Sequence, residues 1–214
     1  MSTPQETSRL TQLSLAEHTA PTLDNAALDE VRRQPLHQQH GPAEMLWRKG
    51  LVKLLNDALA TELVCVLRYK RHYFTAHGLA SPSIADEFAV HALEEMGHAD
   101  RLARRIVQLG GEPDFSPDTL IQRSHAEYDA TLELASMIRT NLIAERVAVE
   151  SYTQLVRLVG ERDPSTRRLL EDILADEQRH ADELQGWLAD SADLSLHPFF
   201  FENTNLSHHP RSIP

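Results

Sequence analysis

The chain has 214 residues, and its 21 Lys and Arg against 32 Asp and Glu give a formal net charge of −11. This acidic balance argues against a nucleic-acid partner, and the single cysteine, Cys65, excludes a disulfide framework, a cysteine-rich zinc site and a thiolate iron–sulfur cluster within one chain. No segment approaches the ~20 apolar residues of a membrane span, and residues 1–15 lack a signal-peptide core, so we expect a cytoplasmic protein with no membrane partner.

The first 41 residues differ in character from the rest of the chain. They are rich in Pro, Ser, Thr and Gln, and only the segment from Leu23 to Val31 keeps a helical spacing, so we expect one short helix at most. From residue 43 the apolar side chains recur every three or four positions, which predicts a long amphipathic helix over 43–77 that stops at Gly78.

Three further long helices follow in the same way. We expect them over residues 82–109, 124–159 and 164–189, with residues 112–123 as a link. Ser81 with Pro82, and later Asp163 with Pro164, supply a capping side chain followed by proline at the first helical position.

No strand alternation competes with the helical pattern. The sequence therefore predicts an all-α protein, a four-helix bundle with a long crossover between the second and third helices. We divide the chain into an N-terminal extension (1–41), the bundle (42–190) and a C-terminal tail (191–214).

Each predicted long helix carries a glutamate on its apolar face, and two of the helices add a histidine. These residues are Glu62, then Glu95 with His98, then Glu145, then Glu177 with His180. The Glu-x-x-His spacing puts both side chains on one helix face. The spacing alone is weak evidence, because a chain rich in Glu and His produces it by chance. The interpretation as one shared site rests instead on the placement of all six residues in the same register on the apolar faces of four helices.

The residue types point to a pair of metal ions. Buried carboxylates without cations would repel one another and take up protons. Two divalent ions bring a charge of +4, which four glutamates neutralise, and two of these glutamates can bridge the ions. Carboxylates with one imidazole per ion suit iron or manganese, although zinc can compete. The alternative is a metal-free bundle in which the six residues are surface ion pairs or solvated charges.

At these residues the chain resembles the ferritin-like superfamily, and bacterioferritins most closely. The resemblance covers about residues 44–190 and rests on the segments 94–100 (EEMGHAD) and 176–180 (DEQRH). It implies that the six residues form a di-iron ferroxidase centre within one subunit. Such a centre oxidises Fe(II) with dioxygen or peroxide and feeds a mineral core inside a 24-subunit shell.

Two further residues gain a role from the resemblance. Tyr69 lies two helical turns after Glu62, where the family has a tyrosine that can hydrogen-bond a ligand or donate an electron; an ordinary core tyrosine is the alternative. Met96 matches the methionine that binds haem across a two-fold interface in bacterioferritins; a methionine that only packs at an interface is the alternative.

For the remaining candidate residues we expect structural roles. We interpret Tyr152 and Cys65 as core residues. We interpret His91 as a core residue or one that supports a ligand, with a metal ligand as the alternative. We expect the other three histidines of the bundle segment to be exposed; these are His72, His77 and His125.

The hypothesis favoured by these patterns is a ferroxidase-type oxidoreductase that binds two irons and serves iron storage or detoxification, as a homo-oligomer of at least two subunits. The long N-terminal extension and the tail put a closed shell in question. The alternative is a di-iron or di-manganese redox enzyme of the peroxidase, oxygenase or catalase type, without a storage shell. The single cysteine excludes a rubrerythrin, and the acidic charge argues against a DNA-protecting starvation protein.

Overall fold

A computed structural model describes residues 23–33, 41–76 and 82–195 of the chain. These residues form two compact units, Met1–Pro42 and Ala43–Pro214, which we consider separately. The predictions made for His77, for Ser81 and for the tail beyond residue 195 lie outside the described residues.

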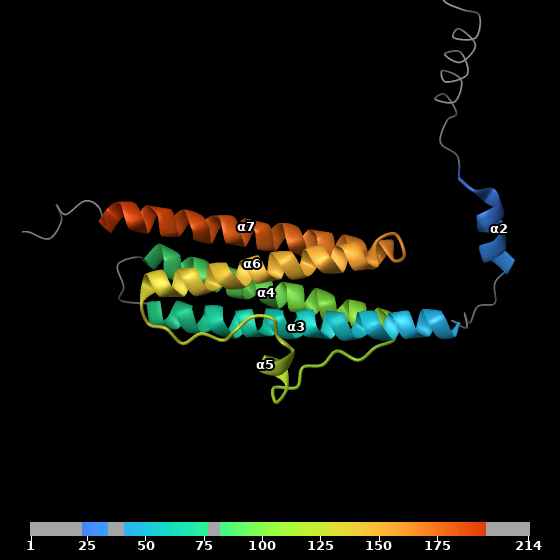
Figure 1. Cartoon of the computed structure of the whole chain (residues 1–214), viewed down its shortest axis with the longest axis horizontal. Helices are drawn as coiled ribbons and strands as arrows, with labels where there is room; N and C mark the ends of the chain where they lie inside the picture. Colours follow the sequence, from blue (N-terminus) through green and yellow to red (C-terminus); the bar gives the residue numbers. More distant parts are fainter. Residues whose placement is uncertain (1–22, 34–40, 77–81, 196–214) are drawn as a thin grey trace, which may run out of the picture. The chain divides into compact units, whose positions relative to one another are not determined.

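All regular elements of the described part are helices, and it contains no strand, which confirms the predicted fold class (Figure 1). The helices are α2 (Asn25–Arg33), α3 (Pro42–Ala76), α4 (Pro82–Gln108), α5 (Leu120–Arg123), α6 (Leu134–Val159) and α7 (Pro164–Ser195). The short helix α2 belongs to the N-terminal unit, matches the one expected there and has no buried residue.

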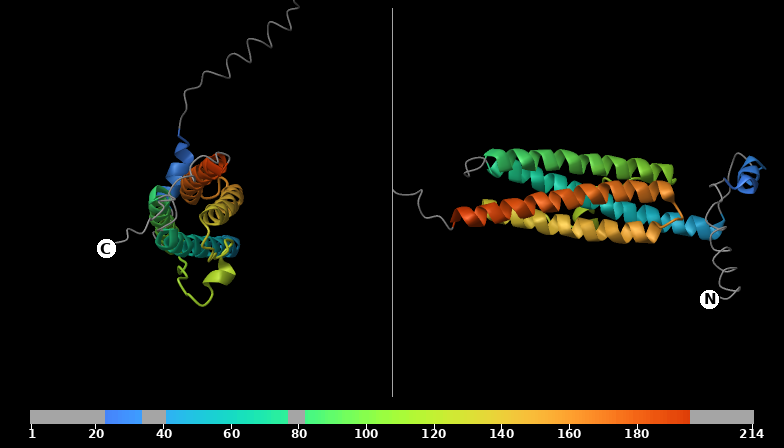
Figure 2. Two further views of the ribbon diagram at one scale, coloured as in Figure 1. Left: turned by 90° about the vertical axis from the view of Figure 1, so that its left-hand side faces the viewer. Right: turned by 90° about the horizontal axis from the view of Figure 1, so that it is seen from above.

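The four long helices pack lengthwise as a bundle (Figures 1 and 2). Helices α3 and α4 are antiparallel, and so are α6 and α7. The connection from α4 to α6 returns along the bundle, so that α4 and α6 run in the same direction. This is the long crossover that the spacing of the helices predicts.

The crossover is longer than the sequence suggested, because α6 begins at Leu134 and not near Ser124. The carboxylate of Glu133 accepts hydrogen bonds from the amides of Ala135 and Ser136 and so caps the helix there. Two arginines of α3 also hold the preceding segment outside helical geometry: Arg68 donates to the carbonyl oxygen of Glu127 at 2.8 Å, and Arg71 to that of Thr131 at 3.1 Å.

Two apolar clusters fill the interior of the bundle, one toward each end. One gathers around Val64, Phe88 and Ile138, and the other around Leu55, Leu102 and Leu170. The glutamates and histidines singled out above lie in the layer between these two clusters. The fold therefore surrounds a polar layer with packed hydrocarbon on both sides, which excludes bulk water from it.

Candidate metal centre

The structure brings together all six glutamates and histidines that the sequence placed on the apolar helix faces. They come from four helices: Glu62 from α3, Glu95 and His98 from α4, Glu145 from α6, Glu177 and His180 from α7. Each of these residues is at most 3% exposed. Charged residues are seldom buried so completely unless they are paired or bind a metal.

The six residues form two overlapping groups of four. One group contains Glu62, Glu95, His98 and Glu177, and the other contains Glu95, Glu145, Glu177 and His180. The candidate ligand atoms of each group lie within 4.8 Å of one another. Separations of this size are close to the ~4.4 Å that two opposite ligands of one ion reach with bonds of about 2.2 Å. Because Glu95 and Glu177 belong to both groups, the geometry suits two ions that share these two carboxylates.

Both histidines of the groups present the same ring nitrogen to the carboxylates. Nδ1 of His98 lies 3.1 Å from Oε2 of Glu95 and 3.1 Å from Oε1 of Glu177. Nδ1 of His180 lies 3.4 Å from Oε1 of Glu95. Nδ1 is therefore the atom of each imidazole that would bind an ion.

Several buried polar atoms of this layer have no hydrogen bond within the described structure. They are Oε1 of Glu95, Oε2 of Glu145, Oε1 of Glu177 and Nδ1 of His180. Buried polar atoms normally have a partner, and one that is left without costs free energy. These atoms fit a pair of metal ions as the missing partners, and the oxygen-rich donor set fits iron or manganese.

Burial and mutual repulsion distribute protons unequally over the carboxylates in the metal-free chain. Burial, reinforced by the charge of Glu95, raises the pKa of Glu62 to about 8. The same two causes raise the pKa of Glu177 well above its usual range. Burial also acts on Glu95, but the close approach of the His180 imidazole and a hydrogen bond with His98 outweigh it and lower the pKa of Glu95. Protons on Glu62 and Glu177 thus reduce the charge that two cations would otherwise neutralise.

Two buried tyrosines donate hydrogen bonds to the glutamates that belong to one group only. The Tyr69 hydroxyl donates to Oε1 of Glu145, and the Tyr152 hydroxyl donates to Oε1 of Glu62. Tyr69 thus contacts a candidate ligand, which was one of the two readings of that residue. Tyr152 is buried in the core, as expected, and its hydroxyl also reaches across the bundle to a second candidate ligand.

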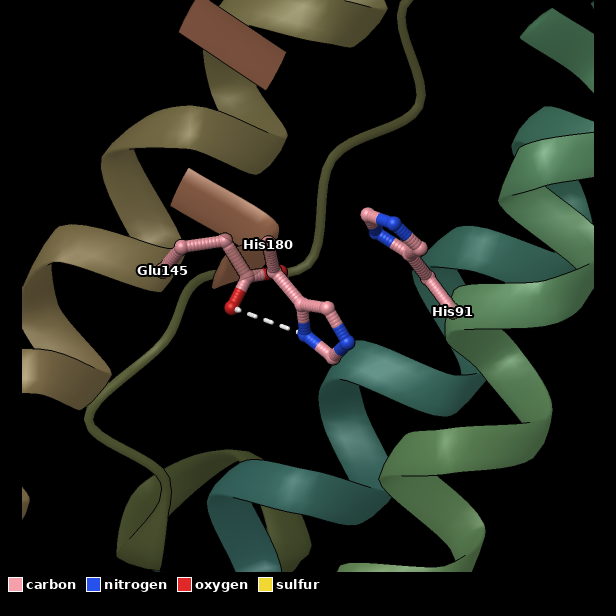
Figure 3. Close-up of side chains that lie close together, drawn as sticks. All are labelled: His91, Glu145 and His180. Atoms are coloured by element: carbon pink, nitrogen blue, oxygen red, sulfur yellow. Dashed lines mark ion pairs between the residues drawn. The ribbon is translucent and has the colours of Figure 1, made fainter. Parts of the chain in front are cut away.

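A third buried histidine, His91, stacks on His180 with ring centroids 4.2 Å apart and planes 23° apart (Figure 3). Its nitrogens are both engaged: Nδ1 lies 3.1 Å from the Tyr69 hydroxyl, and Nε2 lies 2.9 Å from Oε2 of Glu183. Although His91 lies close enough to Glu145 and His180 to share an ion with them, stacked rings do not direct their in-plane lone pairs to one point. His91 is therefore placed to support Tyr69.

Each of the three histidines turns its outer nitrogen, Nε2, toward a half-exposed acidic side chain. The pairs are His98 with Asp176 at 3.2 Å, His180 with Glu94 at 2.7 Å, and His91 with Glu183 at 2.9 Å. We call Glu94, Asp176 and Glu183 the outer carboxylates. Such contacts orient a histidine and increase its basicity as a ligand. We did not identify the outer carboxylates from the sequence, although an acidic residue directly precedes both Glu95 and Glu177.

The other singled-out residues lie away from the cluster. Met96 is on the outer face of α4 and 36% exposed, and Cys65 is buried in the core. His125 is exposed, as expected. The expectation that His72 is exposed was wrong: its side chain is fully buried, because Nδ1 contacts the Asn141 amide at 3.0 Å inside the bundle.

Comparison with known proteins agrees with this geometry. A family model described as "Ferritin: Ferritin-like domain" matches residues 52–193, which is more than half of the chain. A bacterioferritin from Desulfovibrio desulfuricans is 28% identical over 131 residues, covering 61% of this chain and 69% of the relative. A nutrient stress-induced DNA-binding protein from Synechococcus is 31% identical over 140 residues, covering 63% of this chain and 78% of the relative.

Solved structures show the same fold. A bacterioferritin-related dodecameric thioferritin from Bacteroides fragilis superposes with a TM-score of 0.68 at 29% identity, over 72% of this chain and 92% of the other. The Desulfovibrio desulfuricans bacterioferritin, whose structure describes a diiron site, gives a TM-score of 0.64 at 24% identity, over 72% and 86%. The match of the family model and the helical bundle together show that this chain belongs to the ferritin-like domain family.

Proposed function

We propose that the chain is a di-iron carboxylate protein that oxidises Fe(II) to Fe(III) with dioxygen or peroxide, in the service of iron storage or detoxification. The observation that carries this proposal is the pair of overlapping four-residue groups that share Glu95 and Glu177. One Fe(II) would bind Glu62 and His98, the other Glu145 and His180, and the shared carboxylates would contact both.

The reaction balances with iron as the substrate. Two Fe(II) lose one electron each, and dioxygen takes up these two electrons with two protons to give hydrogen peroxide. With hydrogen peroxide as the oxidant, the same two electrons and two protons give two waters. When bound, the iron pair supplies the electrons.

The chain's own residues hold, neutralise and shield the substrate ions. The four glutamates match the charge of +4 on two Fe(II), and one imidazole Nδ1 atom would add to the coordination of each ion. Tyr69 and Tyr152 fix the orientation of Glu145 and Glu62 through their hydroxyls. The apolar clusters on both sides keep bulk water away and so strengthen these electrostatic interactions.

We also propose that the chain forms a homo-oligomer of at least two subunits. Apolar side chains lie exposed on the outer surface of α3 and α4: Leu67, Phe74, Val90, Leu93 and Met96. Exposed apolar surface of this kind favours contact with another protein surface. Met96 belongs to this set, so that a haem ligand and an interface methionine both remain open as its role. Native mass spectrometry, with a haem absorption spectrum, tests both the number of subunits and the haem.

No helix in the described part of the chain combines the length and the apolar content needed to cross a bilayer. The net charge of −11 disfavours nucleic acid as a partner. We therefore propose ferrous iron and an oxidant as the ligands, and the cytoplasm as the place of action.

Stepwise addition of Fe(II) to metal-free protein in air tests the proposed function, with ferric absorbance and soluble iron per chain as readouts. Continued accumulation of soluble ferric iron well beyond two per chain supports storage. Fast oxidation that saturates at two irons per chain supports the alternative, a redox enzyme without a shell. Oxidation no faster than in buffer contradicts the iron reaction and points to manganese or to a metal-free bundle.

A further inference from the structure

The outer carboxylates converge on one cation, the guanidinium of Arg179 on α7. Its Nη2 lies 3.0 Å from Oε1 of Glu94 and 3.6 Å from Oδ1 of Asp176, and its Nη1 lies 3.3 Å from Oε1 of Glu183. Glu94 belongs to α4, while the other two belong to α7. A single side chain therefore contacts the acidic partners of His91, His98 and His180 and joins two helices of the bundle.

The position of Arg179 suits a role in orientation more than in stability. Its side chain is 41% exposed, and ion pairs at such a surface contribute little free energy of folding. Three carboxylates that lie this close would move apart without a cation between them. The planar guanidinium offers several N–H donors in fixed directions, so it can hold the three carboxylates at once, which a lysine ammonium on a flexible stem cannot do equally well.

We infer that Arg179 is a positioning residue for the metal centre. By holding the outer carboxylates, it keeps Nε2 of His91, His98 and His180 in polar contact on the solvent side. At His180 its own Nη2 also lies 3.3 Å from Nε2. The Nδ1 atoms of His98 and His180 then point inward to the ions. This inference rests on the proposed two-ion site and adds a control element to it that lies outside the ligand set.

The chain offers a matched control on the neighbouring helix. Arg101 of α4 is also an arginine of this surface, but it lies 3.2 Å from Asp172 and 3.9 Å from Asp176. It therefore reaches one outer carboxylate, where Arg179 reaches three. A comparison of Arg179→Gln with Arg101→Gln separates the positioning role from the general loss of one surface cation.

The first measurement is the affinity of metal-free protein for Co(II), followed without oxygen through the visible absorption of the bound ion. Loss of residues that orient metal ligands typically weakens binding by about 10- to 100-fold. We expect a weakening in this range for Arg179→Gln, a smaller one for Arg179→Lys, and binding close to that of the unmodified protein for Arg101→Gln. Equal weakening by the Gln variants of Arg179 and Arg101 would overturn the inference.

The second measurement does not depend on metal. Proton NMR of metal-free protein labelled with ¹⁵N-histidine detects the Nε2–H protons and their exchange with water. We expect Arg179→Gln to accelerate this exchange at all three histidines, and Arg101→Gln to accelerate it at His98 alone. Unchanged exchange in a folded Arg179→Gln variant also overturns the inference.

The two measurements keep this inference apart from the proposed function. If the unmodified protein binds no Co(II), the two-ion site fails, whereas the exchange data still report whether Arg179 holds the histidines. Thermal unfolding of each metal-free variant shows whether it is folded. If Arg179→Gln does not fold, Arg179→Lys, which keeps the positive charge, takes its place in the comparison. If Arg179→Lys leaves both the proton exchange and the Co(II) affinity unchanged, the geometry of the guanidinium is not what positions the histidines.

Discussion

Tyr152 on α6 donates a hydrogen bond to Oε1 of Glu62 on α3, across the width of the bundle. The reciprocal contact runs from Tyr69 on α3 to Glu145 on α6. Burial raises the pKa of both tyrosines well above the usual range, which keeps the hydroxyls protonated and able to donate. Each of the two glutamates that belong to one four-residue group only is thus oriented by a tyrosine from the opposite helix.

This reciprocity predicts separate effects for the two tyrosine variants. Tyr152→Phe removes the donor to Glu62 and should weaken one of two binding steps for Co(II) by about 10-fold or more, as loss of a group that orients a ligand typically does. Tyr69→Phe should weaken the other step by a similar factor. Calorimetric titration resolves the steps, and Tyr128→Phe, at an exposed tyrosine of the crossover, is the control. Identical effects of both variants on both steps would contradict the assignment.

The shared and unshared glutamates should also differ in their effect on metal content. Glu95 belongs to both four-residue groups and Glu62 to one. We expect Glu95→Ala to lose both ions and Glu62→Ala to retain about one per chain, because the second group stays intact. Elemental analysis after desalting measures this, with Glu87→Ala on the exposed side of α4 as the control. Retention of both ions by Glu95→Ala would contradict the shared role of Glu95 in the two groups.

Metal binding should release protons near neutral pH. Burial raises the pKa of Glu62 to about 8, and that of Glu177 is also raised, so both carboxyl groups hold protons at pH 7 that an ion must displace. Affinity for Co(II) should therefore rise with pH up to about 8. An indicator dye in weakly buffered solution counts the protons released, and the Glu62→Gln variant should release fewer. Binding without proton release would contradict the protonated state.

The raised pKa of Glu62 also determines how the stability of the metal-free protein changes with pH. The folded-state pKa of Glu62 lies above its unfolded value of 4.5. Its contribution to the stability of the metal-free protein is therefore fully present below pH 4.5 and is lost as the pH rises through about 8. Bound ions should reverse this loss, since they require the carboxylate. Denaturant unfolding at several pH values, with and without Co(II), tests the reversal.

At lower pH, we expect the buried His72 to change the stability of the protein in the opposite direction. Burial and the charge of Arg68 lower its pKa from 6.5 to about 4, although Asp129 acts in the other direction. The neutral imidazole therefore contributes stability above pH 6.5 that is lost as the pH falls through about 4, by roughly 3 kcal/mol in full. The free energy of unfolding of His72→Gln should lack this decline, whereas that of His125→Gln, at an exposed histidine, should keep it. Parallel curves for all three proteins would contradict the assignment.

Most of the fold could be predicted from the sequence because its signals are local. Apolar residues repeat every three or four positions along each long helix, and Asp163 caps α7 through the Thr166 amide at 3.0 Å, as the Asp-Pro pair indicated. The start of α6 could not be predicted in this way. The segment after Ser124 has helical composition, but contacts with Arg68 and Arg71 from a distant part of the chain keep it extended.

The candidate ligands were found because inward-facing glutamates on apolar faces stand out in a sequence. The outer carboxylates do not stand out, since an exposed acidic residue on a helix is common, and only the folded structure shows which ones reach a histidine. His72 was misread for a related reason. Its partner Asn141 lies on another helix, 69 positions along the chain, so no local pattern indicated that its Nδ1 has a partner inside the bundle.

The two antiparallel helix pairs contribute equivalent halves of the centre. Helices α3 and α4 supply one Glu and one Glu-x-x-His, α6 and α7 supply the same set, and each half receives its tyrosine donor from the other. Neither pair can complete an ion's surroundings alone, because Glu95 and Glu177 lie on different halves. The proposed metal binding would therefore be coupled to the docking of one helix pair on the other. Two fragments separated by a cut in the crossover should reassociate more tightly when the ions are present than when they are absent.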